Sequence, residues 1–286
     1  MTPTPFRVGL LLTYRCSAEC RHCFFECSPR RTEVMTHQTA QRVITEAVSL
    51  GAKWVSFSGG EPFLEYDSLR DLISLSSENG LNTEVVSNGF WGETIEKAQG
   101  VLKPLIEAGL DVLNLSVDDF HCEYVPFESV RNAYWGAVDL GVKIALMVST
   151  GKDSEITSES LPELLGDDRI QVAGKSRILN SHTVLFETQF TPIGRGAGLR
   201  YDPVHFTEIR CGEVLRDIGV APNGDVMPCC GPLGTRNVLG NINEEGLGMI
   251  LDRAGQEPRY KRIREARAPV IVDGRYSSRC HACVEN

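Results

Sequence analysis

The sequence predicts an α/β fold, in which a partial (β/α)6 barrel precedes a small, cysteine-rich α+β domain. Three observations support this prediction. Over the first 190 residues, six apolar runs alternate with helical patterns, which favours parallel strands joined by right-handed crossovers. Polar or glycine-rich motifs follow several of these runs, at the strand ends where such barrels bind their ligands. Ten cysteines are present, and seven of them form two sets near opposite ends of the chain.

The strands are predicted from short apolar runs, and the helices from apolar residues at helical spacing. The expected strands are residues 6–13, 53–58, 82–87, 110–117, 142–149 and 183–190. The expected helices are residues 36–50, 66–79, 93–108, 127–140 and 158–166.

The glycine-rich residues 191–198 indicate a turn between two domains. We therefore expect a barrel domain of residues 1–200 and a second domain of residues 201–286, which suits a chain of this length. In the second domain, an Asn-Gly pair predicts a hairpin over residues 216–228.

The first cysteine set is Cys16, Cys20 and Cys23, directly after the first strand. Three thiolates on one loop suit an iron-sulfur cluster, whereas structural zinc sites usually bring two ligand pairs. His22 offers a fourth ligand, but it would strain to reach the metal bound by its neighbour Cys23. Disulfides are not expected, because the chain begins without a signal segment and a cytoplasmic location is predicted. Cys27, four residues beyond the set, is expected to be a packing thiol.

The second cysteine set offers four thiolates, which would complete a cluster without an open iron. Its members are Cys211, Cys229, Cys280 and Cys283. Zinc remains an alternative here, because a CxxC pair plus two further cysteines is also a zinc-site pattern. Cys230 is an alternative ligand to its neighbour Cys229.

The CxxxCxxC loop after the first strand, followed by a Gly-Gly-Glu-Pro turn after the second, resembles the radical S-adenosylmethionine superfamily. The resemblance implies that Cys16, Cys20 and Cys23 hold a 4Fe-4S cluster whose open iron binds S-adenosylmethionine. Glycines let the backbone approach this ligand, and Glu61 supplies an anion for its ammonium group. The expected cofactor contacts are Gly59, Gly60, Glu61, Pro62, Asn88 and Ser116.

The second domain resembles the Twitch domain, a shortened relative of the SPASM extension. This resemblance implies that the second cysteine set holds an auxiliary 4Fe-4S cluster. The full SPASM pattern needs further cysteines after the CxxC pair, and the chain stops three residues beyond Cys283. One auxiliary cluster is therefore expected.

The resemblance implies a radical S-adenosylmethionine enzyme of the oxidoreductase or epimerase type. Such an enzyme generates a 5'-deoxyadenosyl radical that abstracts a hydrogen atom from an unactivated carbon. The expected substrate is a ribosomally made peptide, modified by cross-linking, oxidation or epimerisation. The alternative is a small-molecule dehydrogenase or epimerase that acts on an amino sugar or a similar natural-product intermediate. A non-catalytic electron carrier is disfavoured, because a carrier needs no cofactor-holding turn.

Three candidate catalytic residues follow the fourth strand: Asp118, His121 and Cys122. The thiol of Cys122 is a candidate hydrogen donor to a substrate radical, with simple packing as the alternative. Asp118 and His121 are candidates to bind substrate or to deprotonate a radical intermediate. Alternatively, they only cap the following helix.

Charge and composition limit the classes of partner that we expect. A net charge of -9 argues against nucleic acid, and no apolar run reaches the roughly 20 residues of a membrane helix. An electron donor such as flavodoxin or ferredoxin is expected. Only 15 residues precede Cys16, so we expect a separate protein to bind any leader peptide.

Overall fold

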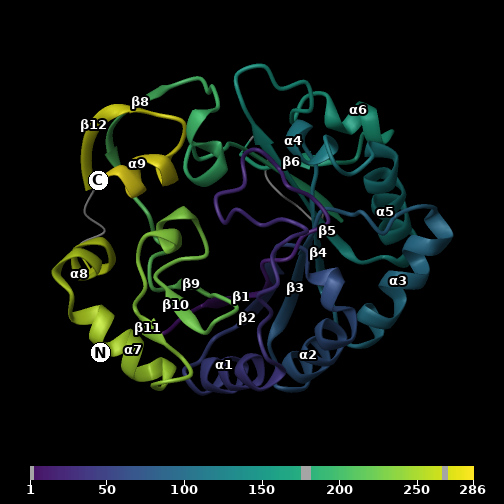
Figure 1. Ribbon diagram of the computed structural model, residues 1–286. Coiled ribbons are helices and arrows are strands. Elements are labelled where there is room, and N and C mark those ends of the chain that lie inside the picture. Colours follow the sequence, from purple (N-terminus) through teal and green to yellow (C-terminus); the bar gives the residue numbers. More distant parts are fainter. Residues whose placement is uncertain (1–2, 175–181, 266–269) are drawn as a thin grey trace.

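The computed structural model describes residues 3–174, 182–265 and 270–286, and its main sheet curves into a partial barrel (Figure 1). Within these residues the sheet has ten strands, in the order β11-β10-β9-β1-β2-β3-β4-β5-β7-β6. Six neighbouring parallel strands in this order, from β1 to β7, confirm the predicted (β/α)6 barrel. They are β1 (Arg7–Thr13), β2 (Trp54–Gly59), β3 (Asn82–Ser87), β4 (Val112–Ser116), β5 (Lys143–Thr150) and β7 (Thr183–Gln189).

Helices cover the outer face of this sheet, and each lies within three residues of its predicted bounds (Figure 1). Their ends follow local signals: the Thr36 hydroxyl accepts a hydrogen bond from the Thr39 amide at 3.1 Å, and Gly141 ends a helix in the left-handed conformation. The helices are α1 (His37–Ser49), α2 (Tyr66–Glu78), α3 (Ile95–Glu107), α5 (Phe127–Leu140) and α6 (Leu161–Leu165).

The main hydrophobic core lies between the sheet and these helices. Side chains alternate between the two faces of a strand. Leu10, Phe57 and Leu113 are fully buried in this core, whereas Gly9 and Leu11 line the inside of the barrel. The inside of the barrel is therefore left free to bind a ligand.

The predicted hairpin over residues 216–228 is confirmed, and it extends the barrel sheet. Its strands are β9 (Asp217–Val220) and β10 (Asp225–Met227), and β11 (Gly240–Asn241) follows them. Strand β9 pairs in parallel with β1, from Arg7 opposite Asp217 to Leu10 opposite Val220. The second part of the chain is thus hydrogen-bonded to the first barrel strand, and the expected boundary near residue 200 stays a prediction.

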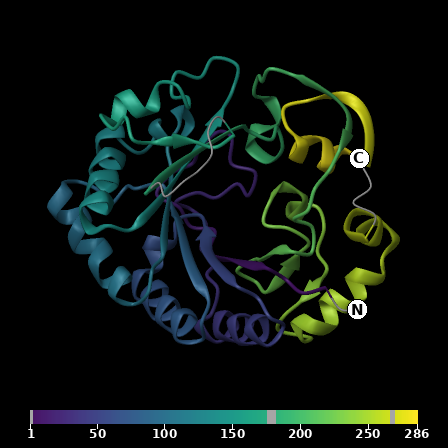
Figure 2. The same cartoon turned by 180° about the vertical axis from the view of Figure 1, so that it is seen from behind.

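A second, two-stranded sheet lies on the β1 side of the barrel, as the two opposite views show (Figures 1 and 2). It consists of β8 (Val204–Ile209) and β12 (Val270–Tyr276), and α9 (Arg279–Glu285) packs against it. Helices α7 (Leu247–Gln256) and α8 (Pro258–Glu265) precede β12. The shorter elements are η1 (Pro62–Glu65), α4 (Asp119–Cys122), β6 (Gln171–Val172), η2 (Gly194–Gly198) and η3 (Pro232–Thr235). Among the described helices, none has both the length and the apolar composition needed to cross a bilayer.

Candidate active site at the carboxyl end of the barrel

The first cysteine set lies on the loop that leaves β1. Cys16 and Cys20 are buried in one small cluster, and the half-buried Cys23 packs against them. Local hydrogen bonds shape the loop: the Ala18 amide donates to Cys16 Sγ at 3.4 Å, and the Cys23 amide donates to the Cys20 carbonyl at 3.1 Å. The loop therefore brings three free thiols together at the carboxyl end of the first strand.

The surroundings of these thiols oppose ionisation unless a cation binds. Burial raises the pKa of Cys16 to about 12 and also raises the pKa of Cys20. A hydrogen bond with the Cys27 thiol lowers the pKa of Cys23 to about 6. Metal ligands must be deprotonated, and a buried negative charge is costly without a partner. This donor set therefore fits the iron-sulfur cluster that the sequence predicts.

The Gly-Gly-Glu-Pro turn at the end of β2 presses against the cluster loop. Gly59 adopts a φ of 130°, which favours glycine. The Gly60 amide donates to the Thr13 carbonyl at 2.6 Å, and the Glu61 amide donates to the Arg15 carbonyl at 2.9 Å. The turn and the cluster loop therefore form one unit, and a ligand at this edge of the barrel would contact both.

Gly60→Ala is expected to separate this turn from the cluster loop. A Cβ atom at residue 60 would lie 2.1 Å from the Arg15 carbonyl oxygen, so the backbone has to move. We expect a loss of about 1–3 kcal/mol in the free energy of unfolding, together with weaker binding of S-adenosylmethionine. Thermal unfolding and a cofactor titration measure the two effects. Gly100→Ala is the control for added side-chain volume, because a Cβ there meets no atom within 4 Å and Gly100 has no positive φ.

Glu61 connects the ends of β2 and β3. Its carboxylate is fully buried and accepts hydrogen bonds from the Phe63 amide at 3.2 Å, the Ser87 hydroxyl at 3.0 Å and the Asn88 amide at 2.9 Å. Burial raises the pKa of Glu61 to about 7. Glu61 therefore fixes the turn to the next strand end, and its expected contact with an ammonium group stays a prediction.

Asn88 continues this connection to the first cysteine. Its side-chain amide donates to the Ser17 hydroxyl at 3.0 Å and lies 3.8 Å from Cys16 Sγ. Hydrogen bonds to cluster ligands orient them and tune their metal. Asn88 is thus placed to act on the cluster loop, and its expected contact with the cofactor stays a prediction. Pro62 is buried at the start of η1, and Ser116 lies at the carboxyl end of β4.

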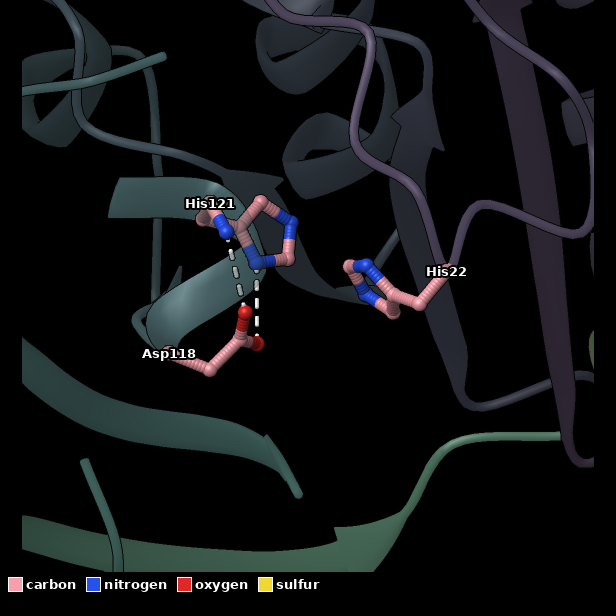
Figure 3. Close-up of side chains that lie close together, drawn as sticks. All are labelled: His22, Asp118 and His121. Atoms are coloured by element: carbon pink, nitrogen blue, oxygen red, sulfur yellow. Dashed lines mark hydrogen bonds and ion pairs between the residues drawn. The ribbon is translucent and has the colours of Figure 1, made fainter. Parts of the chain in front are cut away.

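Asp118 and His121 form a hydrogen-bonded pair beside the cluster loop. The buried Asp118 carboxylate accepts from the His121 amide at 3.0 Å and lies 2.9 Å from His121 Nδ1 (Figure 3). Burial opposes the charge on His121, but the adjacent carboxylate raises the pKa of its imidazole. Asp118 also caps α4, as the alternative interpretation expected. Catalytic roles for this pair stay predictions.

His22, between Cys20 and Cys23, faces this pair across the site. Its ring lies 4.9 Å from the His121 ring and stacks on Phe120 at 4.7 Å. The buried His22 Nδ1 has no hydrogen-bond partner in the part of the chain that the structure describes. Ligand atoms of His22, Asp118 and His121 lie within 4.8 Å of one another (Figure 3). An unpaired nitrogen at this position suits contact with a bound cofactor or substrate.

A cavity of about 800 Å³ occupies the inside of the barrel. Phe25 of the cluster loop contributes to its lining, together with apolar side chains such as Leu11, Val86 and Met147. Arg7 also lines the cavity and forms ion pairs with Glu84 at 3.2 Å and with Asp217 at 2.6 Å. The cavity thus extends from the cluster loop to a charged network at the amino ends of the strands.

Cys230, which the sequence indicated only as an alternative cluster ligand, lines this cavity. Its side chain is exposed there and lies beside Gly9, where an added Cβ would be 3.6 Å from Cys230 Cβ. Cys122, in contrast, is half-buried against the main core and is not among the residues that line the cavity. The doublet Cys229-Cys230 is the signal in the sequence, but it does not say which thiol faces the cavity, because both residues lie in a bend after β10 and not in a strand.

The second cysteine set comes together from three separate segments. Cys211 follows β8, Cys229 follows β10, and Cys280 and Cys283 lie three residues apart on one face of α9. Burial raises the pKa of Cys229 to about 12, and the nearby Cys280 and Cys283 act in the same direction. Burial likewise raises the pKa of Cys280 to about 11, and the nearby Cys211 and Cys283 act in the same direction. Cys229 thus lies near Cys280 and Cys283, and Cys211 lies near the same pair, so this thiol set fits a closed cluster that the protein alone coordinates.

The fold and the two thiol sites define an iron-sulfur enzyme with an auxiliary-cluster domain. Residues 10–145 match the model of the radical SAM superfamily, and residues 211–284 match that of an iron-sulfur cluster-binding domain, SPASM. The chain therefore belongs to the radical S-adenosylmethionine superfamily. Its cofactors are S-adenosylmethionine and two iron-sulfur clusters.

Individual relatives agree with this assignment. YydG of Bacillus subtilis (strain 168) is 28% identical over 235 residues, which cover 79% of this chain and 69% of YydG. The fold is similar to that of Streptococcus suis SuiB bound to precursor peptide SuiA, with a TM-score of 0.60 and 16% identity over 92% of this chain and 67% of SuiB. It is also similar to that of BtrN in complex with AdoMet and 2-DOIA, with a TM-score of 0.54 and 14% identity over 93% of this chain and 89% of BtrN.

Proposed function

We propose that this enzyme epimerises a residue of a ribosomally made peptide. The observation that carries this proposal is the free thiol of Cys230, which lines the barrel cavity while Cys229 faces the terminal cysteine pair. In the proposed assignment, Cys16, Cys20 and Cys23 hold the cofactor-binding cluster. The auxiliary cluster is held by Cys211, Cys229, Cys280 and Cys283. Three cysteines then hold no cluster, namely Cys27, Cys122 and Cys230, and of these Cys230 lines the cavity.

When bound, S-adenosylmethionine and the first cluster supply a 5'-deoxyadenosyl radical, which abstracts a hydrogen atom from an unactivated substrate carbon. The chain itself must hold that carbon in the cavity and exclude water. Cys230 then donates a hydrogen atom to the opposite face of the carbon radical, so that its S–H bond breaks and a C–H bond forms. One electron, from a donor such as flavodoxin or ferredoxin, and one proton restore the thiol.

Two relatives support a peptide substrate. YydG is named for peptide biosynthesis, and SuiB was solved with a bound precursor peptide. The cavity supports it too, since the walls near the cluster loop are apolar and suit the side chain of a peptide residue. A separate protein that binds the leader peptide remains part of this proposal.

A small natural-product intermediate is the second candidate substrate. The cavity volume of about 800 Å³ lies within the range of small-molecule sites. BtrN, with a similar fold, was solved with AdoMet and 2-DOIA. Cys230 is compatible with epimerisation of such a substrate as well, so the substrate has to be tested directly.

The test uses the anaerobically reconstituted enzyme with S-adenosylmethionine, a reductant and the short peptides encoded beside its gene, in deuterated water. We expect 5'-deoxyadenosine and a peptide that gains one deuterium at an inverted α-carbon, because a thiol exchanges its hydrogen with solvent. Mass spectrometry and chiral amino-acid analysis measure the product. A peptide lighter by two hydrogens would instead indicate oxidation or cross-linking. Absence of 5'-deoxyadenosine from reduced, cluster-loaded protein would favour an electron carrier.

A further inference from the structure

The segment that the sequence indicated as a turn between domains packs directly on the cluster loop. In η2, Gly194 has a φ of 55°, and an added Cβ would lie 2.8 Å from the Phe24 carbonyl oxygen. A Cβ on Gly196 would lie 3.4 Å from His22 Cα. The approach at Gly194 needs glycine, and both residues place the backbone of η2 against the loop that carries the first cysteine set.

Arg195, between these glycines, uses its side chain to bind the backbone of the cluster loop. Its Nε donates to the Cys20 carbonyl at 3.1 Å, and its Nη2 donates to the Cys27 carbonyl at 2.6 Å. The two carbonyls lie on either side of Cys23, so one guanidinium spans the part of the loop that presents this thiol. A planar fork is suited to such a two-point contact, which a lysine ammonium cannot reproduce.

The positive charge of Arg195 lies beside the loop that carries the three thiols, because its guanidinium contacts the carbonyls of Cys20 and Cys27. The side chain of Arg195 is 21% exposed and lies 3.9 Å from a carboxylate oxygen of Glu19, so solvent and this carboxylate screen the charge only in part.

We propose that Arg195 is a positioning residue that fixes the cluster loop and raises the reduction potential of the first cluster. The proposal rests on the assignment of Cys16, Cys20 and Cys23 as its ligands. A reduced cluster carries one more negative charge than an oxidised one, so a fixed cation beside it favours reduction. Arg195 thereby makes the electron that starts catalysis easier to accept. The hydrogen bonds to the two carbonyls keep the loop in the geometry that retains iron.

The test compares Arg195→Met and Arg195→Lys with the wild-type full-length, reconstituted enzyme. The readout is the midpoint potential of the electron paramagnetic resonance signal that changes when S-adenosylmethionine is added, since only the first cluster responds to it. We expect a lower potential for Arg195→Met and a potential near wild type for Arg195→Lys. Both variants should lose iron to a ferrous chelator at least about tenfold faster, as the loss of one charge-assisted hydrogen bond predicts.

Arg21→Met is the matched control, because Arg21 lies on the same loop with a side chain that is 57% exposed and paired to Glu123, whereas Arg195 lies near Glu19. It should leave potential and iron loss unchanged. A wild-type potential and wild-type iron retention in Arg195→Met would overturn the proposal. If Arg195→Met does not fold, the rate of iron loss from Arg195→Lys still shows whether the two-point contact of the guanidinium retains iron. These readouts need no substrate, so they remain valid if the proposed peptide chemistry is wrong.

Discussion

Alanine at Cys20 is expected to remove one of the two clusters and to abolish cleavage of S-adenosylmethionine. Cys20 is buried beside Cys16, and its own carbonyl is held by Arg195, so the loop presents this thiol in a fixed position. Reconstituted wild type should hold about eight irons per chain and Cys20→Ala about four, because each cubane contains four. Formation of 5'-deoxyadenosine should fall to background.

Cys122→Ala is the control for this experiment, because Cys122 packs against the main core and is not part of the small cluster that contains Cys16 and Cys20. It should keep about eight irons and normal cleavage, if two cubane clusters are present. A Cys20→Ala protein that retains a full iron complement would contradict the assignment of the first cluster. Equal iron loss in both variants would point to misfolding.

Cys230→Ala is expected to separate cleavage from product formation. The thiol lines the cavity, so its loss should leave radical generation intact but remove the hydrogen donor. Formation of 5'-deoxyadenosine should continue, iron should stay near about eight per chain, and the inverted residue should disappear from the product. Iron analysis, chromatography of the nucleoside and chiral analysis of the peptide measure the three quantities.

The neighbouring substitution Cys229→Ala supplies the matched comparison. Because Cys229 lies close to Cys280 and Cys283, its replacement should remove about four irons. If Cys230→Ala lost the irons and Cys229→Ala kept them, the two roles would be exchanged and the proposed donor would be wrong. Normal epimerisation by Cys230→Ala would direct attention back to Cys122.

The barrel strands could be predicted because each depends on local pattern. Short apolar runs separated by amphipathic helices identify parallel units whatever their neighbours are. The pairing of β9 with β1 could not be predicted, because it joins Arg7 to Asp217 and no local pattern records so distant a partner. The same reason explains why β8 and β12 were missed, since Val270 pairs with Ile209 across two intervening helices.

The sequence predicts the site residues whose chemistry requires a particular residue type. It does not predict those whose position depends on how distant segments pack. Cysteine spacing on one loop indicates a cluster directly, and the structure groups Cys16, Cys20 and Cys23 as expected. The contact of Arg195 with the loop depends on how a distant segment packs, which spacing does not reveal. Cys230 differs from Cys229 only in the direction of its side chain, which the sequence does not reveal because both residues lie in a bend after β10.

The parallel pairing of β9 with β1 limits how freely this enzyme can exchange parts with its relatives. Strand β1 leads directly into the cluster loop, and β9 is the neighbour that supports its other edge. A chimera that takes its C-terminal half from another enzyme must therefore bring a strand in matching register, or the radical-generating end of the barrel will shift. Recombination at residue 200 would take β1 and β9 from different enzymes, although the two strands are neighbours in one sheet. Engineers who want a new specificity should move the crossover point beyond β10.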